Sequence, residues 1–166
     1  MIKLVKCGEG DMDKIEGLER RIFKPSEQYT LSFISWLCRS CSRFSFIAYD
    51  GDKPIGYIIS CIDAPRQGHV VAVGLIKDYR GRGLGRKLMC ASMCSLGDSI
   101  DRIVLEVRVS NYVAQGLYRD LGFQVRDQIR SYYSDGEDAY YMVMEEDDYR
   151  NALVKCGCAN RSGRNF

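Results

Sequence analysis

The glycine- and arginine-rich segment 77–87 is the part of the chain whose residue types and spacing most clearly indicate chemistry. It contains five cations and one acid, a local charge of +4, whereas the whole chain carries a formal charge of only +2. Glycines let backbone N–H groups approach a ligand closely, and a following helix would add unpaired donors and a favourable dipole. Since these are the groups that hold phosphate, the segment predicts a phosphate-binding loop.

Several phosphate-binding patterns compete for this segment. A P-loop requires Gly-Lys followed by Ser or Thr, and here Gly85 is followed by Arg and Lys. A dinucleotide fingerprint requires glycine at position 86, and Asp101 precedes its strand instead of ending it. The alternative is that the segment binds no ligand and is only a glycine-rich turn with solvated arginines. The remaining pattern, Arg80-x-x-Gly83-x-Gly85 between an apolar strand and a helix, resembles the pyrophosphate loop of the GNAT acetyltransferases.

Further segments carry the same resemblance. Leu105–Asn111, together with Leu117-Tyr118 and Leu121-Gly122-Phe123, is similar to the second half of the GNAT core. Segment 132–140 is similar to the C-terminal hairpin of protein N-terminal acetyltransferases. The resemblance covers roughly residues 2–145 and is strongest to the archaeal enzymes of that group, which are related to bacterial ribosomal-protein alanine acetyltransferases. The family's Pro-Glu-Asn-Tyr appears here as residues 25–29, Pro-Ser-Glu-Gln-Tyr, with one extra residue.

The resemblance implies a reaction. Residues 1–145 would form one GNAT domain that transfers an acetyl group from acetyl-CoA to the α-amine of protein or peptide N-termini, nascent chains among them, by direct attack in a ternary complex. An α-amine has a pKa of about 7.7–8.0, about 2.5 below that of lysine, so a modest general base suffices at neutral pH. Two alternatives stay open: a lysine or small-amine acetyltransferase, and a non-catalytic acyl-CoA sensor.

The resemblance also assigns residues to the cofactor. Backbone amides of 81–86 would hold the pyrophosphate, and the strand edge at 73–75 would pair with pantetheine. Gly74 interrupts this apolar strand and predicts a splay or bulge, and a backbone N–H near Leu75 would meet the oxyanion. The expected cofactor residues are Val73, Gly74, Leu75, Arg80, Gly81, Arg82, Gly83, Leu84, Gly85, Arg86, Asn111 and Tyr118.

Three side chains are the catalytic candidates. His69, the only histidine, and Glu106 match positions at which relatives place their base, and they would deprotonate the amine through an ordered water. Tyr118 would protonate the departing thiolate. If these residues had no catalytic role, His69 would be a surface histidine, Glu106 a half-exposed acid on a strand, and Tyr118 a helix tyrosine that packs on the sheet. Two protein ligands make a poor divalent-metal site, so no metal is expected. A cysteine relay is disfavoured because no cysteine stands beside His69 in a recognisable motif.

Aromatic and acidic residues of two loops are the expected peptide contacts. Tyrosine offers a hydroxyl on a rigid ring, although tyrosines of a hairpin are as often packing residues. Glu27 would orient the first substrate residue or serve as an alternative base. The stretch 135–148, with seven acids, could attract a cationic amine, but a solvated face is the more usual role. The expected substrate residues are Phe23, Glu27, Tyr29, His69, Tyr132, Tyr133 and Tyr140.

The elements that must position these residues follow from periodicity and turn signals. Asp11 and Thr30 are candidate caps of the first two helices. The run 69–76 suits a strand buried on both faces. The sequence predicts an α/β fold: one mixed sheet of six to seven strands with about four helices, and a tail at 146–166, helical to Lys155 and then mobile. The expected order is a first strand, helices 12–23 and 31–41, strands 44–49, 54–62 and 69–76, helix 83–97, strand 102–107, helix 113–121, and strands 123–133 and 138–144.

Composition limits the cell compartment and the partners. The chain has 166 residues, of which 46% are apolar, enough for one domain with a sizeable core. Its near-neutral charge predicts no nucleic-acid or membrane partner, and a cytoplasmic monomer without a cleavable signal is expected. The eight cysteines are expected to be thiols in a reducing compartment. Only Cys38-x-x-Cys41 has metal-ligand spacing, and no second pair completes it.

Overall fold

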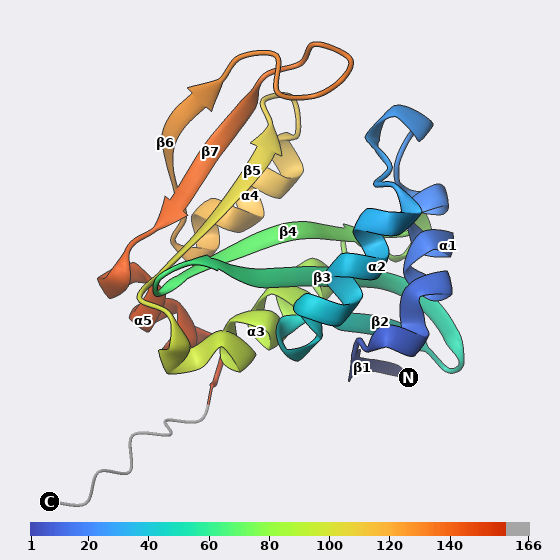
Figure 1. Ribbon diagram of the computed structural model, residues 1–166. Helices are drawn as coiled ribbons and strands as arrows, with labels where there is room; N and C mark the ends of the chain where they lie inside the picture. The colour runs from blue at the N-terminus through green and yellow to red at the C-terminus, as the bar shows by residue number, and fades with distance from the viewer. Residues whose placement is uncertain (159–166) are drawn as a thin grey trace, which may run out of the picture.

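A seven-stranded sheet with the order β1-β2-β3-β4-β5-β7-β6 organises residues 1–158, the part of the chain that the computed structural model describes (Figure 1). Only β4 and β5 pair in parallel, and all other neighbours are antiparallel. The predicted mixed sheet is therefore confirmed. The strands are β1 (Ile2–Lys6), β2 (Phe46–Asp50), β3 (Lys53–Ala64), β4 (Gln67–Leu75), β5 (Arg102–Arg108), β6 (Gln124–Ile129) and β7 (Ala139–Met144).

Helices cover both faces of this sheet. The helices are α1 (Met12–Ile22), α2 (Leu31–Ser40), α3 (Leu84–Leu96), α4 (Tyr112–Leu121) and α5 (Glu146–Lys155). Helices α1 and α2 lie on one face, and α3 and α4 on the other (Figure 1). The Thr30 hydroxyl caps α2 as predicted, accepting from the backbone N–H of Phe33. Asp11 stands at the start of α1, but its carboxylate accepts from Gly8 N instead of capping the helix.

Strands β4 and β5 separate halfway along their length. Their pairing runs from Gln67 with Arg102 to Val70 with Leu105 and stops there, after which the two strands diverge (Figure 1). Residues 71–75 of β4 are consequently half-buried, and the expectation of a strand buried on both faces was wrong for this half. The divergence leaves these residues without a strand partner on the β5 side, although the carbonyls of Val71 and Leu75 accept hydrogen bonds from the side chains of Tyr29 and Arg80.

The irregularity in β4 lies at Val71, three residues before the position that the sequence indicated. Ile59 pairs with Ala72 and Ser60 with Val70, so Val71 is the extra residue of a β-bulge. Gly74 pairs regularly with Tyr57. A Cβ there would lie 2.8 Å from Cγ2 of Ile22, so this glycine allows α1 to pack closely on the strand.

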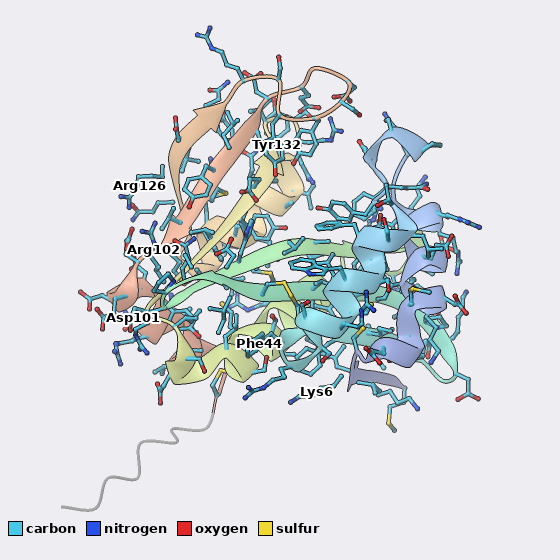
Figure 2. The ribbon with its side chains drawn as sticks, viewed as in Figure 1. Lys6, Phe44, Asp101, Arg102, Arg126 and Tyr132 are labelled. Carbon is cyan, nitrogen blue, oxygen red and sulfur yellow. A yellow bond between two sulfur atoms is a disulfide. The ribbon has the colours of Figure 1, made fainter. Side chains whose placement is uncertain are left out.

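The β6–β7 connection is longer than predicted because the first strand of the hairpin ends at Ile129. Asp138 accepts hydrogen bonds from the Ser131 backbone N–H and the Gln128 side-chain amide, both at 2.8 Å. Ser131 has φ of +49°, which ends the extended conformation. Segment 130–138 is therefore a loop, and it carries Tyr132 near the tip of the β5–β7–β6 half of the sheet (Figure 2).

Three disulfides replace most of the expected thiols. Cys41 is bonded to Cys61, linking α2 to β3. Two more, Cys90–Cys156 and Cys94–Cys158, attach the end of α5 to α3. Cysteines four residues apart share one helix face, and on α3 that face meets the cysteines after α5. Among the described residues only Cys7 and Cys38 are free, and both are buried.

Helix α5 ends at Lys155, as predicted for the helical part of the tail, and it packs against the domain. The buried Tyr149 donates its hydroxyl to the carbonyls of Met93 and Gly97, at 3.2 and 2.9 Å. Of the expected mobile end, 156–166, residues 156–158 are described and two of them are disulfide-bonded, whereas 159–166 lie outside the described residues. Between residues 1 and 158, no helix is long and apolar enough to cross a membrane.

Candidate active site

Two of the predicted catalytic side chains meet where β4 and β5 separate. His69 lies on β4, one residue before the last β4–β5 pair, and Glu106 lies on β5, one residue after it. The ring Nε2 of His69 is 2.7 Å from Oε2 of Glu106. The ring Nδ1 is 2.7 Å from Oδ2 of Asp63, at the end of β3. Sequence reasoning missed Asp63, because it placed this residue in a turn.

The two carboxylates act together on the protonation of His69. Burial of the ring works against the charged imidazolium. The hydrogen bonds and negative charges of Glu106 and Asp63 outweigh it, so the pKa of His69 is raised above its ordinary value. Because a carboxylate only accepts hydrogen bonds, a ring that bonds to both must carry a proton on each nitrogen. Neither ring nitrogen is then free to accept a proton from a substrate.

A cavity of about 300 Å³ opens beside this group. One wall is apolar: Phe33 and Trp36 of α2 stack with ring centroids 5.9 Å apart, and Trp36 is 51% exposed. The polar lining side chains include Asp63, His69 and Glu106. The cavity is lined by Tyr29, Phe33, Trp36, Leu37, Cys61, Asp63, His69, Val71, Glu106 and Tyr132. Phe33 and Trp36 were not among the predicted site residues.

The loop between α1 and α2 is held to the sheet through Tyr29 and Glu19. The Tyr29 hydroxyl donates to the carbonyl of Val71, the bulged residue, at 3.0 Å, and its backbone N–H donates to Oε2 of Glu19 at 3.0 Å. Glu19 is only 2% exposed and also accepts from the hydroxyl of Tyr57. Burial raises the pKa of Glu19, and these two hydrogen bonds oppose that rise.

Arg108 joins the two loops that were expected to hold the substrate. Its Nη2 is 2.7 Å from Oε1 of Glu27, and its Nη1 is 2.9 Å from both Asp135 and Glu137. Its guanidinium also lies 3.9 Å from the ring centroid of Tyr133. Glu27 therefore faces Arg108 and does not line the cavity. The first acids of stretch 135–148, Asp135 and Glu137, likewise form ion pairs with Arg108. Glu145, Glu146 and Asp147 are exposed, as expected of a solvated face.

The remaining predicted substrate residues divide between the cavity and the core. Tyr132 lines the cavity, whereas Tyr133 packs under Arg108. Tyr140 is half-buried and packs against the core. Phe23 also packs on the core, where its ring would lie 3.2 Å from a Cβ at position 74.

The glycine-rich loop has the geometry that a pyrophosphate requires. Gly81 and Gly83 both have φ of +74°, a left-handed conformation that disfavours side chains. The first backbone bond of α3 runs from Lys87 N to Gly83 O, so the preceding N–H groups at the helix start have no partner within the helix. Within the described part of the chain, none of the five cations of segment 77–87 forms an ion pair.

The other expected cofactor residues adjoin this loop. The β4 edge at 73–75 is unpaired on the β5 side, and Gly85 leaves space for Leu117 of α4, which a Cβ would approach to 3.2 Å. Tyr118 is buried, which raises its pKa to about 12, and its hydroxyl bonds to none of the described residues. Asn111 caps α4 by accepting from Ala114 N, which leaves its side-chain NH₂ available. The loop, the free edge and the unpaired cations fit acetyl-CoA.

Residues 11–123 match the acetyltransferase (GNAT) family. The chain belongs to this family. It is 34% identical to an N-alpha-acetyltransferase of Saccharolobus solfataricus, over 80% of this chain and 86% of that protein. Its acetyl donor is acetyl-CoA. Across residues 1–158, no group of three or more His, Cys, Asp or Glu side chains could hold a metal ion.

Solved structures share the fold. The ribosomal-protein-S18-alanine N-acetyltransferase of Escherichia coli superposes with a TM-score of 0.76 at 25% identity, covering 88% of this chain and 94% of that one. Naa50 of Arabidopsis thaliana, solved with the bisubstrate analogue CoA-Ac-MVNAL, has a TM-score of 0.75 at 23% identity, covering 87% of this chain and 98% of that one. The GNAT fold predicted from the sequence is therefore confirmed.

Proposed function

We propose that this acetyltransferase acetylates the α-amine of protein N-termini, by direct attack of the amine in a ternary complex. The observation that best supports this proposal is the contact between His69 and Glu106. It lies beside a cavity, at the point where β4 loses its pairing with β5 and its edge becomes available to a cofactor. The resemblance to a named N-alpha-acetyltransferase over most of both chains supports the same substrate.

Glu106 is the proposed base. Its Oε2 is used by His69, its Oε1 bonds to none of the described residues, and the side chain lines the cavity. An α-ammonium in the cavity would pass a proton to Oε1 through a water molecule. The neutral amine then attacks the thioester carbon: a C–N bond forms, and the C–S bond breaks when the intermediate collapses.

The remaining roles belong to groups around the thioester. A backbone N–H near Leu75 would stabilise the oxyanion. The Tyr118 hydroxyl would give its proton to the leaving thiolate, and the second proton that the attacking nitrogen loses would restore this hydroxyl. A cysteine does stand beside His69, contrary to the sequence-based expectation, because Cys61 is its direct cross-strand partner. Its sulfur is bonded to Cys41, so it offers no nucleophile for an acetyl-cysteine relay.

Peptides with one reactive amine test the substrate. Initial rates would be compared for a lysine-free peptide with a free N-terminus and for a lysine-bearing peptide with a blocked N-terminus. We expect activity on the first and little on the second. Activity on the blocked, lysine-bearing peptide alone would favour lysine acetylation. Cofactor binding without turnover of any amine would favour the acyl-CoA sensor.

The proposed setting is a monomer in the cytoplasm, with nascent chains among its substrates. Three disulfides are unusual in a reducing cytoplasm, although intracellular proteins of hyperthermophiles are an exception. Light scattering of the purified protein tests the monomer, and alkylation of thiols in acid-quenched cells tests whether these disulfides exist where the protein works. Co-sedimentation with translating ribosomes tests the access to nascent chains.

A further inference from the structure

Asp63 lies at an irregularity in the pairing of β3 with β4. In the β3–β4 hairpin, Ile62 pairs with Gly68 and Ala64 with Gln67, so Asp63 is the extra residue of a β-bulge. Bulges redirect side chains and are frequent beside active sites. Here the redirected carboxylate lines the cavity and contacts the His69 ring.

The carboxylate of Asp63 is fixed from two sides. Its Oδ1 accepts from the side-chain amide of Gln67 at 3.2 Å, and its Oδ2 lies 2.7 Å from Nδ1 of His69. The chain of contacts then continues from Nε2 to Glu106. Four side chains from three neighbouring strands thus form one hydrogen-bonded line that ends at the proposed base.

One cation, Arg102, acts on Tyr141 beside this line, but it is not among the groups that shift the pKa of His69. Tyr29, Tyr132 and Tyr141 face Glu106 from the α1–α2 loop, the β6–β7 loop and β7, and burial raises the pKa of each, so all three stay neutral. The charges that act on the ring are those of Glu106 and Asp63. The orientation and protonation of His69 therefore depend on these two carboxylates.

We propose that Asp63 is a positioning residue for acetyl transfer: it accepts the Nδ1 proton of His69, directs the Nε2–H at Oε2 of Glu106, and so leaves Oε1 of Glu106 to receive the amine proton. This inference rests on the proposed function of the site. Without Asp63, a neutral ring could turn its Nε2 lone pair to Glu106, which repels the carboxylate and allows it to leave its position. Asp63 does not itself touch the substrate.

The only histidine makes the ring directly observable. Nitrogen-15 NMR of the tag-free protein reports the protonation of both ring nitrogens of His69 against pH, without any substrate. We expect both nitrogens protonated at pH 7, and a titration midpoint that falls in Asp63→Asn. Asp52→Asn, the same charge change in the exposed β2–β3 turn, serves as the matched control and should leave the midpoint unchanged.

Kinetics measure the consequence for catalysis. Asp63→Ala should lower kcat about tenfold or more, a part of the usual contribution of a general base, while the KM for the peptide changes less than about twofold. Asp63→Asn keeps an acceptor for Nδ1–H and should lose less. Thermal melts show whether each variant is folded, and if Asp63→Ala is not, Asp63→Asn decides.

Two results would overturn the proposal: a His69 midpoint that is identical in wild type and Asp63→Asn, or a folded Asp63→Ala variant with wild-type kcat. A wild-type enzyme that acetylates no α-amine would instead refute the proposed function. The NMR titration would still decide whether Asp63 controls the ring.

Discussion

Removing the buried carboxylate of Glu19 should loosen the substrate loop from the sheet. In Glu19→Ala the backbone N–H of Tyr29 and the hydroxyl of Tyr57 both lose their acceptor in a site where Glu19 is 2% exposed. An unsatisfied buried donor costs about 1–3 kcal/mol, so for these two donors we expect unfolding in urea to show a loss of about 2–6 kcal/mol. The peptide KM should also rise, since Tyr29 lines the cavity.

Glu19→Gln separates the charge from the hydrogen bonds. Its carbonyl can accept from Tyr29 N, and its amide can donate to the Tyr57 oxygen, so we expect a change below about 1 kcal/mol at pH 7. Burial raises the pKa of Glu19 in the folded state above the ordinary 4.5. The folded protein therefore gains stability as the pH falls through that raised pKa, and the gain is complete below 4.5.

The pH dependence gives the reasoning its sharpest test. Glu19→Gln lacks this gain. Between pH 7 and pH 4, the free energy of unfolding of the wild type should therefore rise relative to that of Glu19→Gln. Glu16→Gln, on the same helix, loses only a partly exposed ion pair with Arg20, so it is the control and should cost less than about 0.5 kcal/mol. The reasoning is refuted by a Glu19→Ala loss below about 1 kcal/mol, by an unchanged peptide KM, or by a stability difference that is flat with pH.

Three further sets of substitutions test the substrate loops, the phosphate-binding loop and the two disulfides between α3 and the end of α5. Arg108→Met should raise the peptide KM about fivefold with little change in kcat, because it removes the ion pairs that link Glu27 to the β6–β7 loop. Equal falls in kcat and kcat/KM in steady-state assays would contradict this. Gly83→Ala should raise the KM for acetyl-CoA about five- to thirtyfold, since a left-handed residue other than glycine costs about 1–2 kcal/mol; an unchanged KM would count against the phosphate loop. Cys156→Ser and Cys158→Ser should each change the free energy of unfolding in urea only a little, because either disulfide alone closes nearly the same loop, of 66 or 64 residues. The double variant should lose about 4 kcal/mol. Losses of the two single variants that add up to that of the double variant would contradict this.

Local patterns made the fold and the cofactor loop predictable. The glycines at 81 and 83, the adjacent cations and the helix start are neighbours in sequence, so their chemistry is readable without a structure. The resemblance to the family placed His69 and Glu106 on neighbouring strands, at the positions where relatives carry their base. The contact between them confirms that placement.

The residues that were missed act through partners distant in sequence. Arg108 joins Glu27 to the hairpin, and the packing that brings them together leaves no periodic pattern. Asp63 reaches His69 because of a bulge, which alternation of side chains does not reveal. The disulfides were missed because the size of the domain argued that it needed none. Cys90 and Cys94, four residues apart on one helix face, carried a signal that was not used.

The central claim is that Glu106 activates an α-amine for direct acetyl transfer. One peptide that carries both a free N-terminus and an internal lysine tests it, with tandem mass spectrometry locating the acetyl group after a single turnover. We predict acetylation of the α-amine by the wild type and a rate lower by about 100-fold or more in Glu106→Gln. Acetylation of the lysine side chain alone, or an undiminished rate in Glu106→Gln, would contradict the claim.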